Sequence, residues 1–151
     1  MKSYTYTAIV PKQSKKLQVF SFCAPAKEIL EFAKIDRIGR DEHGALKGFQ
    51  RPQVAQHINE IREYLAKDEA VLPNSVVIAF TQGVKLVMDK GKKTAKLTIK
   101  CSESSQAFVV DGQQRLTALQ GLPGKNFEVF VSGILCTSED ELRKQFILIN
   151  N

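Results

Sequence analysis

The segment FVVDGQQRLTALQGL, residues 108–122, contains the feature that most restricts how this chain can fold. Residues 108–110 form an apolar run typical of a buried strand, and Leu116 and Leu119 then return at helical spacing. Between these two patterns Gly112 lacks a side chain, so the backbone can turn sharply there and leave space for a ligand to approach. The pattern predicts a strand, a tight turn and a short helix that follow one another without a linker.

The residues of this turn suit an anionic ligand. The N–H groups of Gly112, Gln113 and Gln114 are expected to point out of the first helical turn, where the helix dipole adds partial positive charge. Arg115 follows in the same turn, and a guanidinium group can bind phosphate through two parallel hydrogen bonds. Together these residues predict a phosphate-binding site.

Asp111 has the same sign of charge as a phosphate, so its place beside this turn needs a separate explanation. Three functional ones remain open: it caps the helix, it holds Mg²⁺ that bridges to the phosphate, or it orients Arg115 and an attacking water. A purely structural one also remains, because Asp-Gly is a common signal for a turn and Arg115 can pair with Asp111 at the surface. Asp111, Gln114 and Arg115 are therefore the candidate catalytic residues, and Asp111 is the candidate metal ligand.

Apolar periodicity in the rest of the chain predicts a mixture of strands and helices. About six or seven strands and about four helices are expected, joined mostly by hairpins, which favours an α+β mixed sheet in a single domain over residues 1–151. The expected strands are at 3–10, 16–22, 74–80, two within 84–101, one ending at 110 and 127–135, and the expected helices are at 24–35, 52–68, 113–121 and 137–151, with Pro25, Pro52 and a Ser138–Glu141 capping box as start signals.

The charge of the chain points to a polyanionic partner. The formal net charge is +6, and the absence of a basic amphipathic stripe favours DNA or RNA over a membrane surface. Lysines are concentrated in residues 84–101, and Lys90, Lys92 and Lys93 at the turn of this expected hairpin are candidate DNA contacts. The alternative is a solvated hairpin whose lysines discourage aggregation between sheet edges.

Residues 36–52 are charged, contain three glycines and lack periodicity, so a long loop is expected there. The loop is either a solvated connection or a lid that folds over a nucleotide. Arg51, immediately before Pro52, is a candidate second phosphate clamp. His43 and His57 have no partner at metal-ligand spacing, so both are expected to be structural or to face solvent.

Several classes of protein are excluded by missing patterns. Cys23, Cys101 and Cys136 are widely separated and form no CxxC pair, so reduced thiols are expected instead of a zinc site. The sequence contains no G-x-S-x-G, Walker A or HExxH pattern. Its first ten residues lack a continuous apolar run, so neither a signal peptide nor a membrane anchor is expected, and we expect a cytoplasmic protein.

The segment VVDGQQRLTAL, residues 109–119, resembles the signature of the DGQHR-domain family, whose best-known members are DndB-like proteins linked to DNA phosphorothioation and related modification systems. The likeness covers most of the chain from Gly48 onward. Three other segments also resemble elements of that family, namely GFQRPQVAQHINEIREYL (48–65), SVVIAF (75–80) and QFILINN (145–151).

This resemblance implies a ParB/sulfiredoxin-like α+β fold that binds a nucleotide or DNA phosphate at the turn. It implies ATP and Mg²⁺ as candidate cofactors, and DNA, a nucleotide and other DNA-modification proteins as candidate partners in DNA modification or defence. Some relatives are described as ATPases, others as transcriptional regulators and others as nuclease-like, so these activities stay open as alternatives.

Two features of the resemblance qualify what it implies. The histidine that gives the family its name is Gln114 here, and glutamine does not titrate near neutral pH. This argues against a proton shuttle at that position, whereas positioning a water or binding a phosphate stays open. The family's downstream element normally leads into more protein, so residues 1–151 are also compatible with the N-terminal part of a longer chain.

Overall fold

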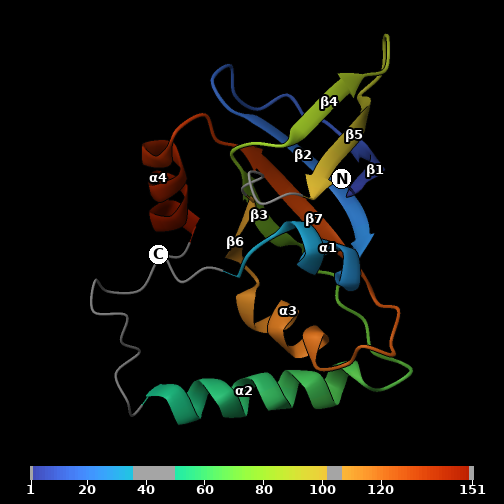
Figure 1. Cartoon of the computed structure of the whole chain (residues 1–151), viewed down its shortest axis with the longest axis vertical. Coiled ribbons are helices and arrows are strands. Elements are labelled where there is room, and N and C mark those ends of the chain that lie inside the picture. The colour runs from blue at the N-terminus through green and yellow to red at the C-terminus, as the bar shows by residue number, and fades with distance from the viewer. Residues whose placement is uncertain (1, 36–49, 102–106, 150–151) are drawn as a thin grey trace.

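The computed structural model describes residues 2–35, 50–101 and 107–149. In these ranges seven strands form one mixed sheet with the order β4-β5-β1-β2-β7-β3-β6, and four helices pack around it (Figure 1). The expected α+β class is therefore confirmed. The elements are β1 (Lys2–Ile9), β2 (Gln18–Pro25), α1 (Ala26–Phe32), α2 (Gln50–Leu65), β3 (Val76–Phe80), β4 (Val84–Met88), β5 (Thr94–Cys101), β6 (Ala107–Asp111), α3 (Gln113–Gln120), β7 (Glu128–Leu135) and α4 (Glu139–Ile149).

The strand that carries the turn motif lies at one edge of the sheet. β6 pairs antiparallel with β3, and the register places Asp111 opposite Val77. β3 in turn pairs with β7, and this is the parallel pair among the described strands. The motif is therefore anchored to a strand in which Val76 and Ile78 are fully buried.

The two faces of the sheet are covered differently. One face packs against α1, α2 and α3 in the main core, where Ile29, Leu65 and Leu116 meet the sheet residues Phe20 and Phe80. The other face carries a smaller cluster under α4, which lies over the β3, β6 and β7 end of the sheet and includes Ala79, Val110, Ile134, Leu142 and Phe146. The turn motif belongs to the face that carries the main core.

Most expected elements occur at the predicted positions. The opening strand pair is confirmed by the antiparallel β1–β2 pairing, and the lysine-rich hairpin by β4 and β5. Ser138 begins α4, because its Oγ accepts a hydrogen bond from the Glu141 N–H at 3.2 Å. Pro25 was predicted in the first turn of a helix, but it ends β2 and stands just before α1, with an extended ψ of 139°. Of the loop expected at 36–52, residues 36–49 lie outside the described residues, and the expectation is wrong for Gln50–Pro52, because α2 already begins at Gln50.

Two tyrosine–glutamate hydrogen bonds fix α1 to β1. The hydroxyl of Tyr4 donates to Glu31 and that of Tyr6 donates to Glu28, each at 2.6 Å. Burial, followed by the bond to Glu28, raises the pKa of Tyr6, while the bond from Tyr4 helps to lower the pKa of Glu31. These bonds hold α1 across the sheet, where it covers the main core.

The three cysteines are unpaired thiols in different surroundings. Cys23 is exposed, whereas Cys136 is buried, and burial raises the pKa of Cys136 to about 11. Cys101 is partly buried, and burial raises its pKa as well. Of the helices that the structure describes, none combines the length and the apolar character needed to span a membrane.

Candidate functional site

The predicted strand, turn and helix occur as expected around Gly112. β6 ends at Asp111, Gly112 adopts a left-handed conformation with φ 96° and ψ 17°, and α3 begins at Gln113. A Cβ atom at Gly112 would lie 2.6 Å from Cγ1 of Val76. The sharp turn is thus confirmed. The expectation of free space for a ligand beside the glycine is wrong, because the side chain of Val76 fills that space.

The first turn of α3 presents N–H groups that have no acceptor within the helix. The first bond back to the turn runs from the Leu116 N–H to the Gly112 carbonyl at 3.0 Å, which leaves the N–H groups of residues 113–115 before it. No side chain caps this helix. The side chain of Gln113 instead turns back and donates to the carbonyls of Val109 and Val110, at 3.1 and 2.9 Å. Any role of Gln113 toward a ligand therefore rests on its backbone.

Arg115 is held by the backbone that leads into β3. Its Nη1 donates to the Asn74 carbonyl at 2.9 Å and its Nη2 to the Ser75 carbonyl at 3.3 Å. The guanidinium also lies 3.7 Å from a carboxylate oxygen of Asp111, which is an ion pair but too long for a hydrogen bond. Only 20% of the Arg115 side chain is exposed. The residue therefore has a structural partner in addition to its place at the turn.

Asp111 does not cap α3, so that explanation of its position is wrong. Its side chain is half exposed at the end of β6 and faces Arg115 across the ion pair. Gly112 separates it from the helix and takes the N-cap position. Of the three functional explanations, binding a metal ion and orienting Arg115 or a water remain compatible with this geometry.

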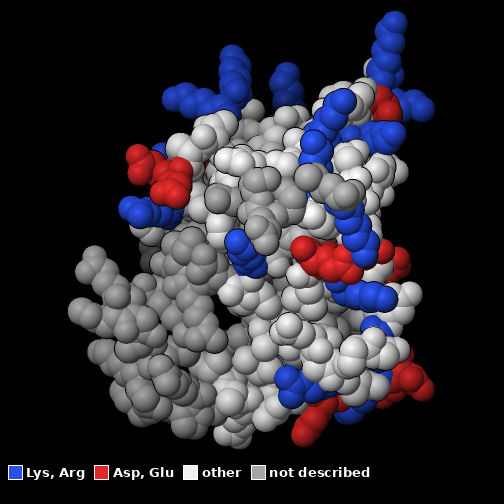
Figure 2. All heavy atoms as spheres, viewed as in Figure 1, with Lys and Arg blue, Asp and Glu red and all other residues white. Residues whose placement is uncertain are grey.

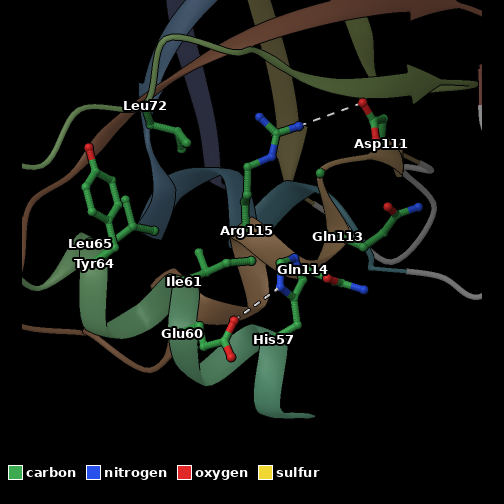
Figure 3. Close-up of a pocket in the computed structure, with 11 residues that line it drawn as sticks. His57, Glu60, Ile61, Tyr64, Leu65, Leu72, Asp111, Gln113, Gln114 and Arg115 are labelled. Carbon is green, nitrogen blue, oxygen red and sulfur yellow. Dashed lines mark ion pairs between the residues drawn. The ribbon is translucent and has the colours of Figure 1, made fainter. Parts of the chain in front are cut away.

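The motif lines a cleft of about 590 Å³ between the turn and α2 (Figure 3). One part of its lining is polar and comes from the turn. The other part comes from α2 and the segment after it, and it has an apolar end at Tyr64, Leu65 and Leu72 and a polar end at His57 and Glu60. Figure 3 shows Arg115 between these two parts, with Ile61, Tyr64 and Leu72 on one side and Asp111 and Gln113 on the other. The lining residues are His57, Glu60, Ile61, Tyr64, Leu65, Leu72 and the motif residues 111–115.

The α2 wall of this cleft was missed from the sequence. His57 was expected to be structural or to face solvent, and its side chain is 58% exposed, yet it lines the cleft and lies 3.9 Å from Glu60. His57, Glu60 and Tyr64 are spaced by three and four residues, so one helical face presents them together. That spacing was visible, but the sequence did not show that this face lies opposite the motif.

Packing between α2 and α3 sets the position of this wall. Arg62, in the last turn of α2, donates from its Nε to the Ala118 carbonyl of α3 at 3.4 Å. At the same C-terminal end of α2, the Lys125 ammonium, from the segment after α3, donates to the carbonyls of Leu65 and Lys67. The C-terminal end of α2 is thus tied both to α3 and to the segment that follows α3.

The remaining residues predicted from the sequence either lie far from the cleft or have side chains outside the described part of the chain. Lys90, Lys92 and Lys93 are exposed at the β4–β5 turn, at the opposite end of the molecule from α2. Figure 2 shows basic side chains gathered at that end, around the hairpin turn. Arg51 belongs to the first turn of α2, but its side chain lies outside the described residues. The structure therefore brings residues 111–115 together and separates them from the lysines.

The sequence of this chain matches a known protein family over nearly its whole length. A family model for DndB, described as DNA-sulfur modification-associated, matches residues 6–150. The chain belongs to the DndB family. Searches of curated proteins and of solved structures gave no match. The ParB/sulfiredoxin likeness of the fold stays a prediction.

Membership in the DndB family connects this chain with the systems that modify DNA with sulfur. The match extends from β1 to the end of α4, so it includes the motif, the α2 wall and the lysine-rich hairpin. The cleft and the hairpin are accordingly two separate surfaces of one DndB protein.

Proposed function

We propose that this DndB protein binds a nucleotide, with ATP and Mg²⁺ as the leading candidates, in the cleft between α2 and the turn motif. The observation that carries the proposal is the division of one cleft into a polar end with helical N–H groups and an apolar end beside them. A volume of about 590 Å³ lies within the range of small-molecule sites, about 300–1,000 Å³.

The phosphates belong at the polar end. The N–H groups of residues 113–115 and the positive end of the α3 dipole attract an anion, and Arg115 adds a full positive charge at the same place. Asp111 is half exposed at the rim, where its carboxylate would hold Mg²⁺, and the ion would offset the negative charge of the phosphates. The base fits the apolar end, where Ile61, Tyr64 and Leu72 line the wall.

Hydrolysis of the bound nucleotide, if the protein performs it, would use the same residues. We propose that Asp111 and Gln114 position the attacking water and that Arg115 stabilises the charge that develops on the phosphate. Gln114 lines the cleft and has no charge to lose near neutral pH, so its part is to orient and not to transfer a proton.

Calorimetric titration of the folded protein with ATP tests this proposal. We expect binding that needs Mg²⁺ in the wild type and at least about ten-fold weaker binding in Arg115→Lys, because lysine keeps the charge but cannot form the bidentate fork. Asp111→Asn is expected to remove the Mg²⁺ dependence. Arg143→Lys, on the exposed side of α4, is the matched control and should bind as the wild type does.

Two results would contradict this proposal. One is the absence of heat at millimolar nucleotide with the wild type. The other is equal affinity in the wild type and Arg115→Lys together with a normal fold of both proteins. Arg51→Ala can be titrated in the same series, and a weakened affinity would support the second phosphate clamp.

A second candidate function is DNA binding by a non-catalytic regulator, and the exposed lysines of the hairpin favour it. Lys90, Lys92 and Lys93 sit at the β4–β5 turn without an ion pair to a described residue. We expect duplex affinity to fall steeply as salt rises and to survive Asp111→Ala, because the hairpin and the cleft are separate. Fluorescence anisotropy measures both; affinity that is insensitive to salt, or lost in Asp111→Ala, would argue against this candidate.

A further inference from the structure

The sheet has a region on the α4 face that no described helix covers. α4 packs on the β3, β6 and β7 end of that face, through the cluster that contains Ala79 and Ile134. The β4, β5 and β1 end lies beyond this cluster in the strand order. On these three strands the side chains that alternate with the core residues are therefore exposed or partly exposed.

The strand register shows which side chains share this open region. Along β5 they are Lys96, Thr98 and Lys100, since Leu97 and Ile99 between them are buried in the main core. Their neighbours follow from the two pairings of β5. Thr7, Thr5 and Ser3 of β1 lie opposite Lys96, Thr98 and Lys100, and Val87 and Lys85 of β4 lie opposite Lys96 and Thr98.

We name this surface the open lysine face, defined by Lys85, Lys96 and Lys100 with the hydroxyl residues Ser3, Thr5, Thr7 and Thr98. Within the three strands its charge has one sign, because β1, β4 and β5 contain no aspartate or glutamate. The acidic residue at its border is Asp89, directly after β4, which accepts a hydrogen bond from Thr94 at 2.6 Å. Among the described residues, none of its three lysines forms an ion pair. Ammonium and hydroxyl groups on one flat surface are the donors that proteins use on phosphate oxygens.

The dimensions of the face also suit a nucleic acid. Lys96 and Lys100 are four residues apart on one strand, which separates their Cα atoms by about 13 Å at the usual rise of a strand. This is close to the width of the DNA major groove, about 12 Å, so the two lysines can contact phosphates on both sides of it. Lys85 lies one strand away, opposite the residue between them.

We propose that the open lysine face is the surface that contacts the backbone of duplex DNA, and that the lysines at the β4–β5 turn extend it. The inference rests on the proposed DNA-binding function and adds the place and the manner of contact. Duplex DNA fits better than a single strand on these three strands, because their outward residues include no aromatic ring on which a base could stack. The exposed ring on this side of the sheet, Phe130, belongs to β7, beyond β2.

Three triple variants that remove the same charge test this proposal. Lys85, Lys96 and Lys100 are changed to Gln on the open face, and Lys90, Lys92 and Lys93 at the turn. The control changes Lys27, Lys34 and Lys67, which are exposed on the α1 and α2 side of the molecule. Affinity for a short labelled duplex is measured by anisotropy at several salt concentrations, with melting curves to confirm the fold of each variant.

We expect the open-face variant to bind roughly ten-fold more weakly at moderate salt and to lower the slope of log K against log salt by about 2–3, as three lost phosphate contacts require. The control should change the slope by less than about 1. If the open-face variant folds poorly, the single variant Lys96→Gln replaces it. Lys85, Lys96 and Lys100 changed to Arg should keep the wild-type slope.

Each other outcome overturns the inference in a recognisable way. Loss of binding in the turn variant alone would reject the open face and leave DNA binding by the hairpin turn intact. If the open-face variant and the control lost the same affinity for DNA, the loss would reflect the lower net charge and not a contact made by the open lysine face. A wild type that binds no duplex would reject the DNA-binding function itself, and binding to anionic vesicles in place of DNA would assign the face to a membrane surface.

Discussion

Gly112→Ala is expected to destabilise the protein by about 2–5 kcal/mol. Two causes add up. The added Cβ would lie 2.6 Å from Cγ1 of Val76, and overpacking of this kind costs about 1–3 kcal/mol. The φ angle of 96° adds roughly 1–2 kcal/mol for any residue with a side chain. Chemical denaturation of both proteins measures the difference.

Gly91→Ala is the matched control for this experiment. Gly91 at the β4–β5 turn also has a positive φ, 72°, but a Cβ there would meet nothing within 4 Å. Alanine at position 91 should therefore cost only about 1–2 kcal/mol, the conformational part alone. If both variants lost the same stability, the packing of Val76 against Gly112 would not contribute, and the turn would be less tightly built than the structure indicates.

Arg115→Ala is expected to cost about 2 kcal/mol, and Asp111→Ala less than about 1 kcal/mol. The difference follows from their partners. Arg115 donates hydrogen bonds to the carbonyls of Asn74 and Ser75. A hydrogen bond from a charged donor contributes roughly 1.5–3 kcal/mol net of its exchange with water, and less where the bond is exposed, as the one to Asn74 is. Asp111 contributes only an ion pair at 3.7 Å with half of its side chain exposed, and such pairs stabilise little.

The salt dependence of these two variants separates the roles further. The stability that Asp111→Ala loses should be smaller at high salt, because salt screens the exposed ion pair. The stability that Arg115→Ala loses with the bonds to Asn74 and Ser75 should depend little on salt. If Asp111→Ala proved as destabilising as Arg115→Ala, the ion pair would be the main partner of the arginine. The guanidinium would then be committed to Asp111, and the proposed phosphate site would lose its cation.

The motif shows how far local sequence determines local structure. The apolar run at 108–110, Gly112 and the spacing of Leu116 and Leu119 predicted the strand, turn and helix, because each depends on neighbours within a few residues. The parallel pairing of β3 with β7 could not be predicted in this way. The residues of each strand fit several partners, and the choice depends on how the whole chain packs.

In the candidate site, too, the features set by neighbouring residues were predicted and those set by long-range packing were not. Residues 111–115 were found because they are contiguous, whereas the wall formed by Ile61 and Tyr64 depends on how α2 docks against α3. Val76 filling the space beside Gly112 is a long-range contact of the same kind, and for that reason an open corner was wrongly expected. Arg115 was expected near a phosphate, and its bonds to the backbone before β3 were likewise invisible in the sequence.

The helix α2 contributes one side of the cleft while standing outside the sheet, tied to the rest of the molecule through Arg62 and Lys125. The opposite side is formed by a turn that the edge strand β6, its neighbour β3 and the side chain of Val76 hold in place. The cleft is thus formed by a turn that is fixed to the sheet and by a helix that packs beside it. Substitutions along one face of α2 are therefore expected to change the lining of the cleft while the sheet and the turn at Gly112 keep their structure.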